Sequence, residues 1–220
     1  MALAEPLLNA LPAPVMAEAV SAARTMLLVI DIQVDFAAPH GAMGRFGLDL
    51  ASTNAAIGRI ATLIEAARAA SVTVGFARVV TRPETDSRAL RLLYERTGRD
   101  PASAAICRFG TEGADYWVLE PQPGDLEIAK PLYSCFTGTE LGAILAERGI
   151  DTLVLTGMTT ECCVDSTARD AFHRDLNVFV VADACAAYDD EEHVAALRAL
   201  AGNCAVLVDS DTVMAGWRHR

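Results

Sequence analysis

The 220-residue sequence predicts an α/β fold: a three-layer αβα sandwich with a mostly parallel central sheet. Short runs rich in Val, Ile and Leu alternate along the chain with longer segments whose apolar residues recur at helical spacing. Several of the helical segments also begin with a capping signal and end at a glycine. Together these observations indicate a parallel sheet covered by helices on both faces.

The expected strands are six short apolar runs. They cover residues 26–32, 72–79, 126–129, 153–157, 178–182 and 205–208, the third being the shortest candidate. A helix with an apolar stripe is expected between the first two strands. Thr137 and Glu140 begin a second helix that ends at Gly149, and Asp189 begins a third that ends at Gly202.

We expect one domain over residues 25–220, preceded by an N-terminal arm over residues 1–24. Three prolines interrupt the arm, no basic segment precedes its apolar part, and a short helix over 15–23 is expected there. The segment 81–122 departs from the alternation of strands and helices. A short helix over 89–96 followed by irregular chain is expected, and either a lid over a site or a flexible surface loop fits it.

Composition and charge exclude several classes of function. The formal net charge is −11 and no Lys/Arg cluster occurs, so we expect no nucleic acid and no membrane surface as a partner. No run of about 18 apolar residues is present to span a bilayer. The six cysteines are unevenly spaced, without zinc-type spacing, so we expect no disulfide framework, no metal and a reducing cytoplasm.

Two charged residues lie where open parallel sheets bind ligands, at the carboxyl ends of expected strands. Asp31 follows the run 26–30, where burial would raise its pKa toward that of a useful base. It also suits the plainer role of capping the next turn. Lys130 ends the run 126–129, where it is either solvated or paired with a buried acid.

Cys163 follows the strand 153–157 and lies in the expected first turn of a helix. The helix dipole there would lower a thiol pKa, and a free backbone N–H could hold an oxyanion. A buried structural cysteine fits the position equally well. Because consecutive helical residues point about 100° apart, we expect the neighbouring Cys162 to pack against the sheet. His40 is the remaining alternative partner for a catalytic cysteine.

Three sequence blocks carry a resemblance to a known family. The blocks "LLVIDIQVDF", "KPLYSCFTGTEL" and "GMTTECCVDSTARDAF" occur in this order. The chain resembles the isochorismatase-like cysteine hydrolase superfamily over residues 25–209. The resemblance implies that fold, no cofactor, and a catalytic triad of Asp31, Lys130 and Cys163, since the family nucleophile precedes a valine. It also implies a cis peptide between Met158 and Thr159, with an oxyanion hole formed by the backbone N–H groups of Thr159 and Cys163.

Departures from the family pattern narrow the expected activity. Isochorismatases lack the nucleophilic cysteine, so Cys163 favours an amidase. Nicotinamidases carry a metal-binding histidine after the second strand, where this chain reads "ARVVTRPETDS". The chain is therefore most similar to N-carbamoylsarcosine amidase, ureidoacrylate amidohydrolase and biuret hydrolase. We expect a metal-independent hydrolase that cleaves a small amide or ureido substrate through a thioester and releases ammonia or an amine.

Other activities stay open: a nicotinamidase-like amidase, a vinyl-ether hydrolase that does not use Cys163, or a non-catalytic member. Expected substrate contacts are Phe36, Tyr133 and Phe136, for which core packing is the competing interpretation. The candidates for binding a substrate carboxylate are Arg78, Arg82 and Arg108. The resemblance implies a homodimer or homotetramer, to which the apolar arm could contribute.

Overall fold

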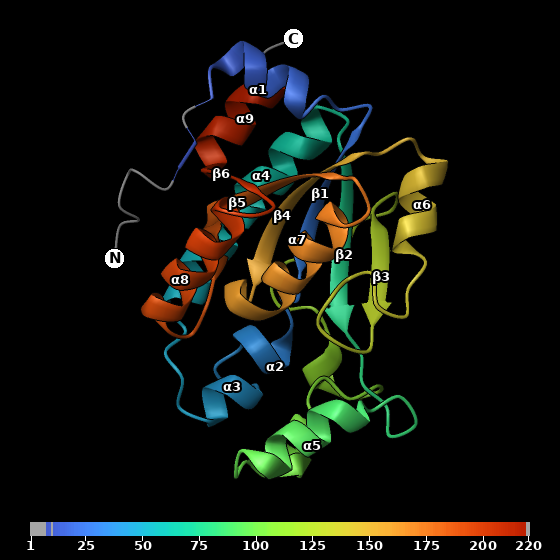
Figure 1. The fold of residues 1–220 in the computed structure, drawn as a ribbon, viewed down its shortest axis with the longest axis vertical. Coiled ribbons are helices and arrows are strands. Elements are labelled where there is room, and N and C mark those ends of the chain that lie inside the picture. Colours follow the sequence, from blue (N-terminus) through green and yellow to red (C-terminus); the bar gives the residue numbers. More distant parts are fainter. Residues whose placement is uncertain (1–7, 10, 219–220) are drawn as a thin grey trace.

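The computed structural model describes residues 8–9 and 11–218 and contains one six-stranded sheet (Figure 1). The strand order is β3-β2-β1-β4-β5-β6, and every neighbouring pair is parallel. The strands are β1 Thr25–Ile30, β2 Thr73–Val79, β3 Leu126–Lys130, β4 Thr152–Met158, β5 Asn177–Ala186 and β6 Val206–Val208. The carboxyl ends of these strands therefore share one edge.

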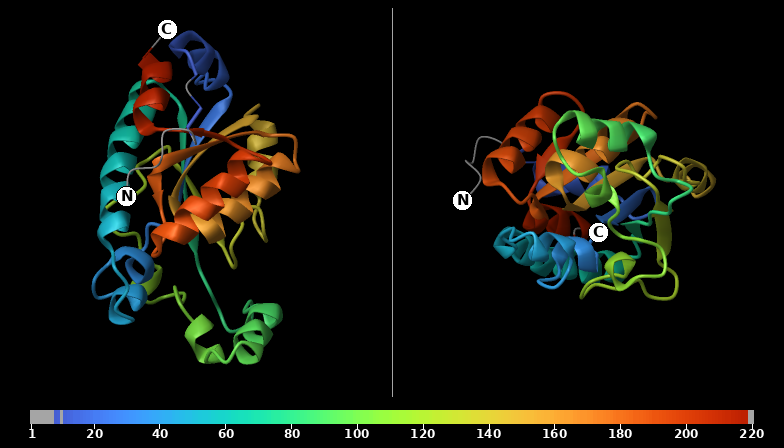
Figure 2. Two further views of the ribbon diagram at one scale, coloured as in Figure 1. Left: turned by 60° about the vertical axis from the view of Figure 1, so that its left-hand side comes forward. Right: turned by 90° about the horizontal axis from the view of Figure 1, so that it is seen from below.

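Helices cover both faces of the sheet (Figure 2). One face carries α1 Ala13–Ala19, α4 Ala51–Ala69 and α9 Ser210–Arg218, and the other carries α6 Leu141–Glu147, α7 Asp165–Phe172 and α8 Asp190–Ala201. This arrangement confirms the predicted three-layer α/β fold. No helix in the described part of the chain is long and apolar enough to cross a membrane.

The central strand β1 separates two hydrophobic cores. Leu27 and Val29 belong to the core under α4, whereas Met26, Leu28 and Ile30 belong to the core under α6 to α8. Successive side chains of a strand point to opposite faces, and both faces of this sheet are covered. A continuous apolar run is the sequence pattern that such a strand needs.

The described part of the N-terminal arm folds back onto its own chain. The helix α1 begins at Ala13, earlier than predicted, because proline is tolerated in the first turn of a helix. Trp217 of α9 donates its indole N–H to the Val20 carbonyl at 3.1 Å, and Met16 is fully buried. The prediction for the arm also covers residues 1–7 and 10, which lie outside the described residues.

The segment 81–122 extends beyond the carboxyl edge of the sheet, where Figure 1 shows α5. It contains α5 Arg88–Arg96 and two 3-10 turns, Pro101–Ala104 and Glu112–Ala114. The buried Gln33 holds the later part of this segment beside β2 by donating to the carbonyls of Val79 at 2.8 Å and Ala114 at 2.9 Å. The short helices α2 Val34–Ala37 and α3 Ala42–Arg45 lie at the same edge.

Candidate active site

Asp31, Lys130 and Cys163 meet at the carboxyl edge of the sheet. They follow or end β1, β3 and β4, and their side chains are at most 5% exposed. The Lys130 ammonium donates to Asp31 Oδ2 at 2.7 Å, to the Leu132 carbonyl at 3.1 Å and to Cys163 Sγ at 3.4 Å. All three of its N–H donors are thus used, which satisfies a buried ammonium.

A close approach of the β1 and β4 backbones positions Asp31. Its φ of 57° is left-handed, which ends β1 one residue before the aspartate rather than at Ile32 as predicted. Aspartate tolerates this conformation better than most residues. The neighbouring strand approaches very closely: a Cβ on Gly157, whose φ is 112°, would lie 2.0 Å from the Ile30 carbonyl oxygen. Only glycine fits at that position.

The turn that carries Cys163 is π-helical and covers Thr160–Val164, where an α-helical first turn was predicted. It is wider because the Val164 N–H reaches five residues back, to the Thr159 carbonyl, at 3.1 Å. The Thr160 hydroxyl lies 2.8 Å from His193 Nδ1 of α8. The peptide bond between Met158 and Thr159 is cis, where the resemblance placed one. These features fix the backbone on both sides of the thiol.

Burial and the attraction between their charges set the pKa values of Asp31 and Lys130. Burial raises the pKa of Asp31, and the Lys130 charge and the nearby Cys163 thiol oppose that rise. Burial would lower the pKa of Lys130, but the Asp31 charge and the neighbouring thiols raise it above its ordinary value. We conclude that Lys130 stays an ammonium ion and that Asp31 is a stronger base than an exposed aspartate.

The Cys163 thiol has a raised pKa, which contradicts the lowering predicted from a helix dipole. A hydrogen bond with Cys162, burial and the Asp31 charge raise its pKa, against the opposing charge of Lys130. The resting sulfur is therefore a protonated thiol that needs a base. Asp31 Oδ1 is buried and has no hydrogen-bond partner among the described residues, so an acceptor lies beside that thiol.

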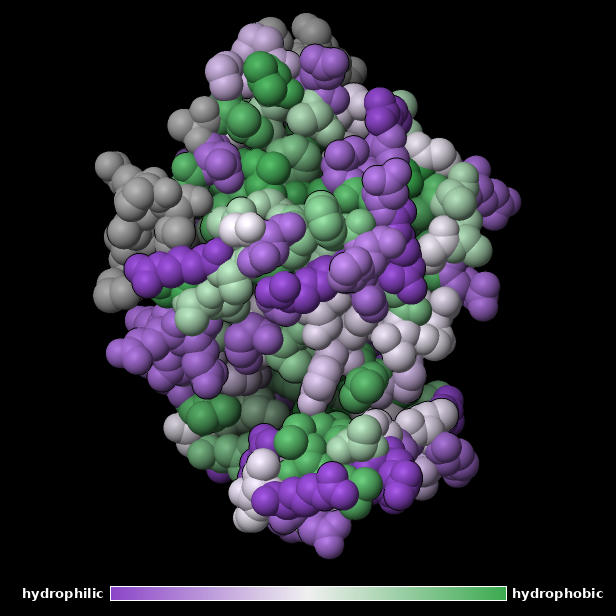
Figure 3. Space-filling model, in the orientation of Figure 1, coloured by the Kyte–Doolittle hydropathy of each residue, from purple (hydrophilic) through white to green (hydrophobic). Residues whose placement is uncertain are grey.

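A cavity of about 380 Å³ opens onto Cys163 between the body and the α5 segment, where Figure 3 shows a recess. Phe36 and Tyr133 line it, as predicted. Phe136, the third aromatic residue expected to contact substrate, does not line it. Its ring is buried in the core beneath α6 and α7, with the Arg174 guanidinium 4.5 Å from its centroid.

Comparisons with known proteins identify the family of this chain. The Isochorismatase domain family matches residues 25–212. The chain belongs to the isochorismatase family. The ureidoacrylate amidohydrolase RutB of Methylobacterium radiotolerans is 36% identical over 189 residues, which are 80% of this chain and 71% of that protein. RutB of Azorhizobium caulinodans is 34% identical over 190 residues, 81% of this chain and 82% of that protein.

Two solved structures extend the comparison of this isochorismatase-family chain. A cysteine hydrolase from Pseudomonas syringae pv. phaseolicola has a TM-score of 0.80 at 28% identity, covering 91% of this chain and 95% of its own. N-carbamoylsarcosine amidase from Thermoplasma acidophilum has a TM-score of 0.66 at 29% identity, covering 86% and 97%. The resemblance drawn from the three sequence blocks is confirmed.

The three arginines named as carboxylate candidates are occupied elsewhere. Arg108 forms a bidentate pair with Asp86 at 2.6 and 2.7 Å. Arg82 stacks 3.3 Å above the centroid of the Phe109 ring. Arg78 donates to the Ala114 carbonyl at 3.5 Å and does not line the cavity. That prediction is wrong for this cavity, because the three side chains already have partners in the segment 81–122.

The sequence analysis did not name Arg99, Glu161 and Tyr188, which line the cavity. Cys162 was expected to face the sheet, but the wider π-helical turn leaves both thiols at the cavity. The position of Glu161 between Thr159 and Cys163, in the third sequence block, is the signal that could have identified it. Arg99 lies in an irregular segment without a period, which gave no signal.

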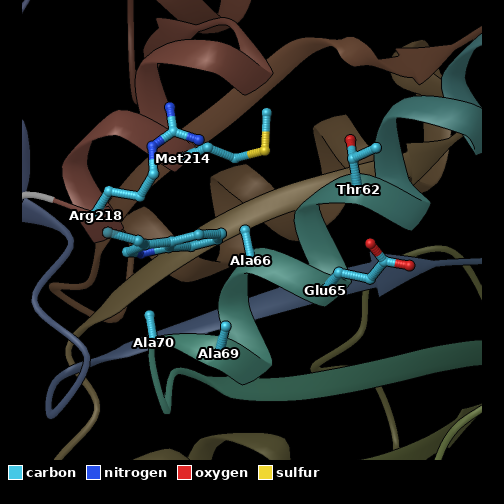
Figure 4. A pocket seen from close by; sticks show the side chains of 8 residues that line it. Thr62, Glu65, Ala66, Ala69, Ala70, Met214 and Arg218 are labelled. Atoms are coloured by element: carbon cyan, nitrogen blue, oxygen red, sulfur yellow. The ribbon is translucent and has the colours of Figure 1, made fainter.

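Other polar clusters and hollows do not compete with this site. His40 contacts Glu112 at 3.2 Å and does not line the cavity at Cys163, so it is not the partner of the thiol. A hollow of about 650 Å³ lies between α4 and α9 at the opposite end of the sheet (Figure 4). Small alanines and Trp217 form much of its wall. Among the described residues, no group of three His, Cys, Asp or Glu side chains could hold a metal ion.

Proposed function

We propose that the chain is a metal-independent amidohydrolase that cleaves a C–N bond of a small ureido or carbamoyl substrate through a thioester on Cys163. The buried contact of Asp31, Lys130 and Cys163 at the floor of the cavity carries this proposal. The names of the RutB relatives and of the structurally similar N-carbamoylsarcosine amidase support the substrate class. Nucleophile, base and orienting cation are all within reach of one reacting carbonyl.

The first step is proton transfer from the thiol to Asp31. The Cys163 thiol rests protonated, and Asp31 Oδ1 has no other hydrogen-bond partner among the described residues. Lys130 donates to both Asp31 and Cys163 Sγ, so its charge stabilises the thiolate as it forms.

The thiolate then attacks the carbonyl carbon and forms a tetrahedral oxyanion. The backbone N–H groups of Thr159 and Cys163 hold this oxyanion, and one such donor contributes about 3–4 kcal/mol to catalysis. Asp31 returns its proton to the departing nitrogen, which leaves as ammonia or an amine. Water, deprotonated by the same carboxylate, hydrolyses the thioester and restores the thiol.

Location and assembly belong to the same proposal. All six cysteines are unpaired, which fits a reducing cytoplasm. We place the enzyme there as a homodimer or homotetramer, with a small amide or ureido compound as its partner and no cofactor. Phe46 and Phe109, about three-fifths exposed, offer apolar surface for assembly. Light scattering on the full chain tests the assembly, and a monomer at micromolar concentration would contradict it.

Ammonia release from biuret, ureidoacrylate, N-carbamoyl amino acids, nicotinamide and maleamate tests the activity. Replacing Cys163 by Ala should lower kcat at least about 1,000-fold, because no thioester can form. The matched control is Cys204→Ala, since Cys204 is half-buried at the amino end of β6, away from the cavity. Full activity of the Cys163→Ala protein would refute covalent catalysis and favour a cysteine-independent hydrolase.

A further inference from the structure

The cavity at Cys163 has an asymmetric charge distribution. Of the charged side chains in the described part of the chain, Arg99 and Glu161 line it. Arg99 comes from the segment after α5, and Glu161 from the turn of the nucleophile. The Lys130 ammonium beneath is already paired with Asp31 at 2.7 Å. Arg99 therefore supplies the cation of this cavity that has no paired anion.

Three contacts hold Arg99 in place. Its backbone N–H donates to the Tyr94 carbonyl at 2.8 Å, and its Nε donates to the Thr97 hydroxyl at 3.1 Å. The guanidinium carbon lies 4.2 Å from the centroid of the Tyr94 ring. None of these contacts uses the two terminal nitrogens, and no carboxylate of the described residues forms an ion pair with Arg99. A guanidinium group held in this way can donate two parallel hydrogen bonds to a carboxylate.

Tyr133 links this guanidinium to the nucleophile. Burial raises the pKa of Tyr133 to about 12, with contributions from Cys162, Tyr94 and Cys163, while the Arg99 charge opposes the rise. The phenol therefore lies within electrostatic reach of both the thiols and the guanidinium. Cys163 and Arg99 both line this cavity of about 380 Å³, which has the volume of a site for one small ligand.

Glu161 places the opposite charge near the nucleophile. Partial burial raises the pKa of this carboxyl, and a hydrogen bond with Thr159 opposes that rise. Its oxygens can accept N–H groups, whereas they would repel a carboxylate at this end. A ureido group carries several N–H donors, and the other end of the ligand faces Arg99. The two charges thus set the direction in which a substrate binds.

We propose that Arg99 binds the carboxylate of a ureido or N-carbamoyl acid while Glu161 faces its ureido N–H groups, so that these two side chains determine the specificity of the cavity. This inference rests on the proposed function and narrows it to anionic substrates. The net charge of −11 disfavours the approach of an anion, so a dedicated cation is needed to retain one. Neutral compounds such as biuret leave Arg99 without a partner and bind more weakly.

A pair of isosteric substrates tests the inference: 3-ureidopropionate and its neutral amide, 3-ureidopropanamide. Replacing Arg99 by Met should raise KM for the acid about 10–100-fold, the range of a charge-assisted hydrogen-bond pair, with kcat nearly unchanged. KM for the amide should not change. Arg99→Lys should recover part of the loss as a point charge. Arg96→Met, on the exposed end of α5 and outside the cavity, is the matched control and should behave as wild type.

Glu161→Gln gives a different signature. It should raise KM for acid and amide alike, because both carry the same ureido group. The ratio between the two substrates then stays that of the wild-type enzyme. A selective loss on the acid alone would contradict the assigned direction of binding.

Calorimetric titration of the Cys163→Ala protein with both compounds separates this inference from the proposed function. If the wild-type enzyme hydrolyses neither compound, the ureido assignment fails, and acid binding that is lost on adding Arg99→Met still supports the anion site. If the enzyme hydrolyses acid and amide with equal KM and Arg99→Met changes neither, the Arg99 inference is overturned while the amidohydrolase stands. Absence of binding by either compound also overturns it.

Discussion

At the residue scale, the site joins a protonated thiol to a buried base. Asp31 and Lys130 are at most 1% exposed, and each keeps its charge because the other is 2.7 Å away. Removing one partner of such a pair leaves an uncompensated buried charge, which is far more costly than losing a surface ion pair. The cluster can therefore move one proton without ever exposing an isolated charge.

The pH profile reports on this base. In the proposed mechanism hydrolysis needs Asp31 as a carboxylate, and burial raises its pKa above the ordinary 3.8. As pH falls through that raised pKa, kcat/KM should fall, so the acid limb should lie above the ordinary aspartate range. The measurement is kcat/KM from about pH 4 to pH 8, with circular dichroism at each pH to show that the protein stays folded.

Glu161 supplies the control for this profile, because its pKa is also raised by burial in the same cavity. The Glu161→Gln variant must keep the acid limb if Asp31 causes it. Loss of the limb in that variant would assign it to Glu161, and a limb near 3.8 would contradict the raised pKa of Asp31.

At the element scale, the close approach of the paired strands β1 and β4 holds Asp31 and the turn of Cys163 together. Gly157→Ala should lower the free energy of unfolding by at least about 3 kcal/mol, through a positive φ and a backbone overlap. The Cβ would lie 2.0 Å from the Ile30 carbonyl oxygen. Urea unfolding measures the change.

Gly58→Ala is the matched control for that substitution. Gly58 is exposed in α4, and nothing lies within 4 Å of an added Cβ. Alanine is the better helix former, so stability should rise by about 0.5–1 kcal/mol. Equal losses of stability on substitution of the two glycines would show that the close approach of β1 and β4 has no special role.

The same scale separates what could be predicted from what could not. The apolar runs of the sequence located the six strands. The polar residues at the ends of those runs placed Asp31 and Lys130 at one edge, because parallel strands align their carboxyl ends. The π-helical turn depends on a hydrogen bond between residues five apart in the sequence, and no residue pattern predicts such a bond. Arg99 was missed, and Phe136 was placed at the cavity, because contacts across a cavity depend on how distant segments fold back, which sequence periodicity does not report.

At the scale of the whole molecule, the two ends of the sheet have separate tasks. The carboxyl edge carries the cavity and α5, and the opposite edge is closed by α1 and α9 (Figures 1 and 2). Deleting residues 1–24 would strip Met16 and Val20 from Trp217, so that truncation changes stability as well as any intersubunit contact. The assembly is therefore better tested on the full chain.

This separation predicts that Trp217→Ala destabilises the protein without harming catalysis. The side chain is 5% exposed and donates to the Val20 carbonyl at 3.1 Å, so its removal should cost about 3–5 kcal/mol through a cavity and a lost hydrogen bond. Phe172→Ala, at a half-exposed ring, should cost less than about 0.5 kcal/mol. Urea unfolding gives both values, and kcat is measured well below the unfolding midpoint. A fall in kcat of the folded Trp217→Ala protein would show that the closed edge is coupled to the site, because no Trp217 atom lines the cavity at Cys163.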